Sequence, residues 1–109
     1  MKKTILLAAL IAGFTGTALA QNSTKTIKVW GNCGMCEATI EKAAKIKGVE
    51  SADWNEDTKE LKLTYNPGVA NPDAVQKAIA AVGYDTEAYR GDDKAYNNLH
   101  GCCQYDRKK

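Results

Sequence analysis

The segment Gly31-Asn32-Cys33-Gly34-Met35-Cys36, followed at once by Glu37-Ala38-Thr39-Ile40, decides how this chain folds and what it can bind. It places two thiols three positions apart, where a strand-like pattern gives way to a helix-like pattern. Two cysteines at this spacing can chelate one soft metal ion or close one small disulfide ring. The function of the chain therefore depends on which of these two chemistries the pair performs.

The residues on either side of the segment predict its setting. Ile27 and Val29 alternate with polar residues, which predicts a half-buried strand over residues 26–30, with Trp30 facing solvent or the C-terminal tail. Residues 36–47 repeat at helical spacing and Gly48 stops the pattern. Cys36 would then lie shielded in the first helical turn and Cys33 exposed in the loop, both near a helix N-terminus that favours thiolate.

The rest of the chain completes a recognisable order of elements. A strand is predicted over 49–55 with Ala52 and Trp54 on one face, and a cleaner strand over 60–65 carries Leu61, Leu63 and Tyr65 inward. A helix begins at Asn71-Pro72 and ends at Gly83, and residues 84–90 alternate weakly as a fourth strand. The order predicts an α+β fold of the ferredoxin-like βαββαβ type, a four-stranded antiparallel sheet with two helices on one face.

The ends of the chain indicate its organisation. Residues 1–20 have a basic start, an apolar stretch and Ala18-Leu19-Ala20, the pattern of a cleaved secretory signal peptide. We expect one domain over 21–91 and a tail over 92–109 that contains a short helix within 92–99. We expect no stable insertion in a membrane after cleavage, because no further apolar run is long enough to span one.

Charge narrows the class of partner. The chain has 15 basic and 13 acidic residues, and without Lys2 and Lys3 the two are equal in number. The charges are interspersed, with no basic stripe between aromatic residues, which argues against a nucleic-acid partner.

The ligand chemistry of the pair favours particular ions. Two thiolates alone make a near-linear site that Cu(I) or Hg(II) accepts, whereas Zn(II) usually takes four ligands. An exposed site with few ligands also lets the cysteines of another protein enter and take the ion. This chemistry is suited to metal transfer.

The chain resembles the heavy-metal-associated domain family, in the residues Val29-x-Gly31, Cys33-x-x-Cys36, Ile40, Gly48-Val49 and Gly83-Tyr84-Asp85. The resemblance covers roughly residues 26–90. That family includes copper chaperones, the periplasmic mercury-binding protein and modules of metal-pumping P-type ATPases. The resemblance implies the βαββαβ fold, one metal ion held by Cys33 and Cys36, and Tyr84 packed beside the metal loop.

The loop departs from the usual Gly-Met-Thr-Cys-x-x-Cys of that family. Here Gly31-Asn32-Cys33 is one residue shorter, and the methionine, Met35, lies between the cysteines. We expect Met35 to fill the core gap under the loop, with its thioether as a third ligand as the less favoured alternative. Tyr84 and Met35 would then shield the site. The alternative for Tyr84 is that it serves only as an aromatic residue of the core.

The tail adds His100, Cys102 and Cys103, groups that soft and borderline metals use. Three interpretations stay open. The tail thiols complete the site of Cys33 and Cys36, or they form a second site. Alternatively, the adjacent cysteines form a strained, easily reduced disulfide that serves a redox role. Disulfides between the two cysteine pairs are a further alternative.

Two functions remain. The first is a non-enzymatic periplasmic or secreted metallochaperone or scavenger that binds one Cu(I), with Hg(II), Zn(II) or Cd(II) as alternatives, and passes it on by thiol ligand exchange. Its expected partner is a metal-transporting membrane protein or another thiol-bearing metal protein. We expect a monomer, with a metal-bridged dimer as the alternative. The second function is a small periplasmic thiol–disulfide oxidoreductase, although the predicted fold lacks the proline loop that such enzymes place opposite the cysteines.

Overall fold

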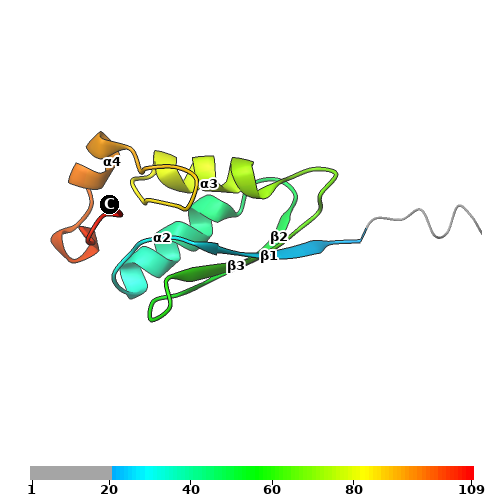
Figure 1. Ribbon diagram of the computed structural model, residues 1–109, viewed down its shortest axis with the longest axis horizontal. Helices are drawn as coiled ribbons and strands as arrows, with labels where there is room; N and C mark the ends of the chain where they lie inside the picture. Colours follow the sequence, from blue (N-terminus) through cyan, green and yellow to red (C-terminus); the bar gives the residue numbers. More distant parts are fainter. Residues whose placement is uncertain (1–20) are drawn as a thin grey trace, which may run out of the picture.

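The computed structural model describes residues 21–109, so the predicted signal peptide, residues 1–20, lies outside the described residues. Figure 1 shows the elements, which follow one another as β1 (Ser23–Lys28), α2 (Gly34–Ala44), β2 (Val49–Asn55), β3 (Glu60–Tyr65), α3 (Pro72–Ala81), α4 (Asp93–Asn97) and the 3-10 turn η1 (Gly101–Cys103). In residues 21–109 no helix has the length and apolar character needed to cross a membrane.

The three strands form one antiparallel sheet in the order β1-β3-β2. Leu61 of β3 pairs with Ile27 of β1 on one side and with Trp54 of β2 on the other. Directly paired residues point to the same face of a sheet, and these three side chains are almost completely buried. The predicted hairpin of residues 49–65 and its inward positions are therefore confirmed.

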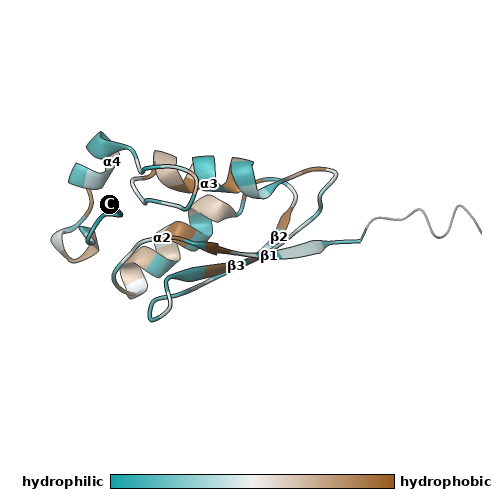
Figure 2. Ribbon diagram, viewed as in Figure 1, coloured by the Kyte–Doolittle hydropathy of each residue, from teal (hydrophilic) through white to brown (hydrophobic). Residues whose placement is uncertain are grey.

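The two long helices, α2 and α3, lie over the same face of the sheet (Figure 1). Helix α3 begins as predicted, because the side chain of Asn71 accepts a hydrogen bond from the N–H of Ala74 at 2.8 Å and Pro72 follows. Both helices contain hydrophobic and hydrophilic residues (Figure 2). Their buried residues join the strands in one core cluster, whose members include Ile27, Val29, Ile40, Leu61, Leu63, Trp54, Val75, Ile79 and Tyr84.

The C-terminal end of α2 differs from the sequence prediction, whereas the end of α3 agrees with it. Helix α2 ends at Ala44, three residues before the predicted end at Lys47, and a turn at residues 47–48 precedes β2. Gly83 adopts a φ of +103°, and a Cβ there would lie 2.7 Å from the backbone nitrogen of Tyr96. Glycine is therefore required at this point, where the end of α3 meets helix α4.

The prediction of a fourth strand over residues 84–90 is wrong, because this segment does not form a regular strand. Within residues 21–109, this segment makes a single bridge, Val29 to Thr86, on the free edge of β1. Two backbone hydrogen bonds flank the bridge, from Trp30 N–H to the carbonyl of Asp85 at 2.9 Å and from Glu87 N–H to the carbonyl of Lys28 at 3.1 Å.

Local hydrogen bonding explains why the strand stops there. The N–H of Thr86 donates to the carbonyl of Tyr89 at 2.8 Å, which closes a tight loop after the bridge. The N–H of Lys28, which a longer strand would bond through its backbone, instead donates to the side chain of Glu87 at 2.7 Å. Weak alternation in the sequence was therefore not enough to make a strand against these competing contacts.

The tail packs onto the domain. As predicted, a short helix forms within 92–99, and the side chain of its N-cap Asp92 accepts a hydrogen bond from Ala95 N–H at 2.9 Å. Beyond it, η1 and the C-terminal residues return toward the start of α2 (Figure 1). Tyr105, only 2% exposed, belongs to the same core cluster as the strands.

Candidate metal centre

The two cysteines of the quoted segment lie at the N-terminus of α2. Cys33 is the N-cap residue, partly exposed, and Cys36 is fully buried in the first turn, as expected. Their Sγ atoms are 3.9 Å apart. A Cβ on Gly31 would lie 3.0 Å from the Trp54 ring, so the loop before the cysteines rests directly on the core. The core thus fixes where the pair sits.

The start of the helix favours ionisation of Cys33. Its pKa is lowered, chiefly by the backbone N–H of Cys36 and next by that of Met35. The first N–H groups of a helix have no partner within the helix and carry partial positive charge, which stabilises a thiolate. Cys33 is therefore the more accessible thiol of the pair and has a lowered pKa.

A third thiol joins them from the tail. The Sγ atoms of Cys33, Cys36 and Cys103 all lie within 4.8 Å of one another. Cys103 is 3% exposed, and burial, followed by the neighbouring Cys36, raises the pKa of its thiol to about 12. All four cysteines are free thiols, so neither the local disulfides nor the cross-bridges are formed in this structure.

Tyr84 closes the inner side of this group. It is completely buried, and its hydroxyl is the one buried side-chain polar atom of residues 21–109 without a hydrogen-bond partner. Burial, followed by contact with Cys36 and Cys103, raises its pKa, so it stays a neutral hydroxyl. Leaving a buried hydroxyl unpaired costs about 1–3 kcal/mol. The group therefore contains one unused hydrogen-bond donor next to two sulfurs.

The remaining predicted site residues lie outside the three-thiol group. Met35 is 51% exposed, so the expectation that it fills a core gap is wrong; it points outward from the first turn of α2. Its Sδ is 3.7 Å from Sγ of the exposed Cys102. His100 is exposed and occupies the N-cap position of η1, without a capping hydrogen bond from its side chain. The two tail thiols therefore differ in exposure: Cys103 is buried and Cys102 is exposed.

The outer face of the loop is tied to the tail through one carbonyl. The side-chain amide of Asn32 donates to the carbonyl of Cys102 at 3.1 Å, and Sγ of Cys33 lies 3.8 Å from the same oxygen. These contacts join positions about 70 residues apart in the sequence. The loop and the tail therefore form one structural unit around the thiols.

Tyr105 anchors the tail in the core. Its hydroxyl donates to the carbonyl of Gly83 and accepts from the N–H of Asp85, both at 2.7 Å. Its ring stacks on Tyr84, with centroids 5.4 Å apart, and meets Tyr96 edge to face. Because Tyr105 is two residues from Cys103, this anchor restricts where the third thiol can lie.

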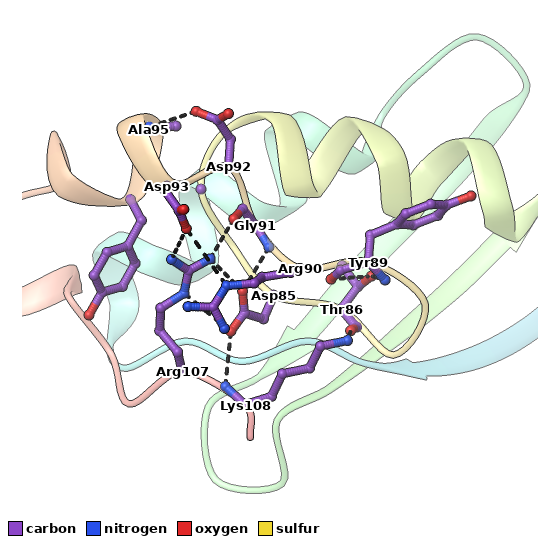
Figure 3. Close-up of polar contacts among 12 residues, drawn as sticks. Asp85, Thr86, Tyr89, Arg90, Gly91, Asp92, Asp93, Ala95, Arg107 and Lys108 are labelled. Carbon is purple, nitrogen blue, oxygen red and sulfur yellow. Dashed lines mark hydrogen bonds and ion pairs between the residues drawn. The ribbon is translucent and has the colours of Figure 1, made fainter.

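A buried ion pair holds the end of the tail. Figure 3 shows Arg107 reaching Asp85, with Nη2 to Oδ1 at 2.9 Å, and Asp93, with Nη1 to Oδ1 at 2.7 Å. Asp85 is completely buried and also accepts from the N–H groups of Gly91 and Lys108. A buried carboxylate with this many donors is well satisfied.

Sequence reasoning missed Asp85, Tyr105 and Arg107 as determinants of the site. The family pattern contains Asp85, but no sequence pattern assigns a role to Tyr105 or Arg107. One signal was available: Tyr105 is an aromatic residue in an otherwise polar stretch, two positions after a cysteine. Such a residue is a candidate anchor.

A second group of ligating residue types combines Glu37 and Glu41 of α2 with Asp53 of β2. Glu41 is used structurally, since it accepts a hydrogen bond from the N–H of Trp54 at 2.9 Å. Exposed carboxylates gather in this way without a metal, so the thiol group is the candidate centre.

Comparison with known proteins agrees with this geometry. The family model described as the heavy-metal-associated domain matches residues 32–85. The copper chaperone CopZ of Staphylococcus epidermidis is 37% identical over 65 residues, which are 58% of this chain and 96% of that protein. The mercuric transport protein periplasmic component of Acinetobacter calcoaceticus is 30% identical over 92 residues, 83% of this chain and 100% of that protein.

Two further similarities concern a pump and a solved structure. A copper-exporting P-type ATPase of Staphylococcus saprophyticus is 35% identical over 68 residues, 61% of this chain, but the match spans only 9% of that ATPase. A solved CopZ metallochaperone superposes with a TM-score of 0.57 at 32% identity, covering 59% of this chain and 98% of the other. The matched family segment contains Cys33, Cys36 and Tyr84 but ends before the tail.

Proposed function

This chain belongs to the heavy-metal-associated domain family, and on that premise we propose that it is an exported carrier of one soft metal ion, with Cu(I) as its principal cargo. Hg(II), and then Zn(II) or Cd(II), are the alternative cargoes. The observation that carries the proposal is the pair of Cys33 and Cys36 sulfurs, 3.9 Å apart at the start of α2, with one thiol accessible and the other buried.

Ligand exchange is the mechanism that this geometry supports. Cys33 lies at the surface with a lowered pKa, so it is suited to meet an incoming ion or a partner's thiolate first. Cys36 is fully buried and holds the ion while ligands are exchanged at the open side. As a partner thiolate bonds to the ion, Cys33 leaves and takes a proton from water. A second partner thiolate then displaces Cys36, which takes a proton in the same way. Only metal–sulfur bonds are exchanged and the ion itself is unchanged, so the protein acts as a carrier and not as an enzyme.

The relatives indicate the class of partner. A copper-exporting ATPase shares sequence with this chain over 68 residues, and a copper chaperone does so over 65 residues. A partner with a similar thiol pair, in a metal-transporting membrane protein or another thiol-bearing metal protein, can accept the ion by the same exchange. The carrier acts as a monomer, with a metal-bridged dimer as the alternative, and it requires no nucleic acid.

Export to the periplasm or beyond is supported by the leader pattern of residues 1–20. The relative from Acinetobacter calcoaceticus, aligned over its whole length, bears the name of a periplasmic component. Measuring the N-terminus of the protein recovered from the periplasmic fraction tests this part. Cleavage after Ala20 is expected, and an intact Met1 in the cytosolic fraction would contradict it.

Anaerobic titration of the reduced protein with Cu(I), Hg(II) and Zn(II), each against a chromogenic competitor, tests the binding. We expect one tightly held Cu(I) or Hg(II) per chain, with binding lost in the double variant Cys33→Ser/Cys36→Ser. Unchanged binding in that variant would contradict the assignment of the site. No tight binding in the unaltered chain, with ready exchange of disulfides with glutathione instead, would favour the oxidoreductase alternative.

A further inference from the structure

The tail thiol Cys103 lies where a third ligand would lie. Its sulfur is within 4.8 Å of both Cys33 and Cys36 sulfurs, and it comes from η1, outside the family segment of residues 32–85. A two-thiol carrier needs no such group. Cys103 thus requires its own explanation.

The position of Cys103 is fixed by the fold. Its N–H donates to the carbonyl of His100 at 2.8 Å, and its own carbonyl accepts from the N–H of Tyr105 at 2.9 Å. Tyr105 is anchored by its hydroxyl to Gly83 and Asp85, and the bridge from Asn32 to the carbonyl of Cys102 ties the same turn to the metal loop. These contacts hold the thiol in place before any ion arrives.

A second observation points independently to a bound ion. The Tyr84 hydroxyl is fully buried, faces Cys36 and Cys103, and has no hydrogen-bond partner. A neutral thiol is a weak acceptor, whereas a metal-bound thiolate is a strong one. The hydroxyl is thus left without a partner in the metal-free protein and would gain one when the sulfurs bind an ion.

We propose that Cys103 is the third sulfur ligand of this site, so that the protein binds its ion through three thiolates from Cys33, Cys36 and Cys103, with the Tyr84 hydroxyl donating to one of the buried sulfurs. This inference rests on the proposed function and names the ligand set of the same site. On binding, each of the three thiols gives its proton to solvent as its sulfur bonds to the ion. Cu(I) and Hg(II) are soft ions that accept thiolate ligands in this number.

The third ligand changes how the ion is released. When a partner thiolate displaces Cys33, two buried sulfurs still hold the ion. Complete transfer then requires the partner to displace both Cys36 and Cys103, one sulfur more than in a two-thiol carrier, so the tail favours retention over rapid delivery. Removing only Cys103 should therefore speed transfer to a two-thiol acceptor.

Cys103→Ala in the full chain tests the assignment, with Cys102→Ala as the matched control. Both variants remove one tail thiol, but Cys102 is exposed and its sulfur lies outside the three-thiol group. We expect Cys103→Ala to weaken Hg(II) and Cu(I) binding at least tenfold, because even outer contacts of a metal site are commonly worth 10–100-fold in affinity. Cys102→Ala should change affinity less than about threefold, since it removes no ligand.

X-ray absorption of the unaltered protein, loaded with one Hg(II) per chain, gives the same answer without relying on a variant. Three sulfur neighbours around the ion are expected, falling to two in Cys103→Ala. Two sulfurs in the unaltered chain would overturn the inference and leave the two-cysteine carrier intact, as would a loss of the third sulfur in Cys102→Ala instead. Absence of any tightly bound ion would refute the proposed function itself.

Discussion

Arg107, two residues before the last residue Lys109, forms an ion pair with the completely buried carboxylate of Asp85, four residues after helix α3 ends. This contact joins the end of the tail to the single bridge that replaces a fourth strand. Arg107 lies four residues after Cys103. The contact that fixes the end of the tail therefore also restricts the position of the Cys103 thiol. We therefore expect stability and metal binding to be coupled through the tail.

Replacing Arg107 by alanine should destabilise the fold strongly. The change leaves the Asp85 carboxylate buried without its main charged partner, which typically costs about 3–5 kcal/mol. Urea unfolding of the reduced, metal-free protein measures the loss.

The control is Lys77→Ala, which removes the surface pair with Asp73, where both side chains are more than half exposed. That change should cost no more than about 0.5 kcal/mol. Equal losses in the two variants would show that the Arg107 contact does not stabilise the domain.

Acid should weaken the tail contact in a predictable direction. Burial raises the pKa of Asp85, but hydrogen bonds from Arg107, Gly91 and Lys108 outweigh it and hold the pKa below its ordinary value. Between the folded and unfolded pKa values the unfolded chain binds more protons, so stability rises with pH. The contribution is complete above the ordinary value of about 4 and is lost as the pH falls through the lower, folded pKa.

Asp85→Asn isolates this dependence. The difference in unfolding free energy between the unaltered protein and Asp85→Asn should be constant near neutral pH and shrink as the pH is lowered below about 4. Urea titrations from pH 7 to pH 2.5 measure it. A difference that grows on acidification would contradict the assigned direction.

Tyr105→Phe should cost about 1–3 kcal/mol, because it leaves the buried Gly83 carbonyl and Asp85 N–H without their shared partner. Tyr89→Phe is the matched control, since the Tyr89 hydroxyl bonds the exposed Asp73. Thermal unfolding of both variants makes the comparison. A loss in Tyr89→Phe as large as that in Tyr105→Phe would argue against the Tyr105 anchor.

The four thiols should differ in their rates of alkylation. Cys102 is exposed and Cys33 partly exposed, while Cys36 and Cys103 are buried. A short pulse of iodoacetamide on the reduced, metal-free protein, read by peptide mass spectrometry, should label Cys102 and Cys33 first. Unfolding in urea should make all four react alike. Labelling of Cys103 as fast as Cys102 in the folded protein would show that the tail does not hold it inside.

The sequence was sufficient for most of the fold because its patterns were strong where burial decides the structure. Leu61 and Trp54 lie in strands where apolar and polar residues alternate. Asn71-Pro72 marks the start and Gly83 the end of a helix whose apolar residues face the core. The sequence prediction failed at residues 84–90. There the Glu87 side chain accepts the Lys28 N–H, and the Tyr89 carbonyl accepts the Thr86 N–H and closes a loop after one bridge. Such competition between side chain and backbone leaves no periodic signal.

The candidate site was predicted in part for a similar reason. The location of Cys33 and Cys36 at the start of a helix follows from local spacing. The choice among the three interpretations of the tail does not, because it depends on Tyr105 and Arg107 finding partners about 20 residues earlier in the chain. Met35 was misjudged because its thioether contacts Cys102, a neighbour that appears only once the tail has folded.

The most direct test of this account is an anaerobic Cu(I) titration of the reduced full chain against a chromogenic Cu(I) chelator, beside Cys33→Ser/Cys36→Ser. The account predicts that the unaltered chain removes one equivalent of Cu(I) from the chelator and that the double variant removes none. If the unaltered chain leaves Cu(I) with the chelator, or if the double variant competes equally well, the pair at the start of α2 is not a Cu(I) site and the central claim is wrong.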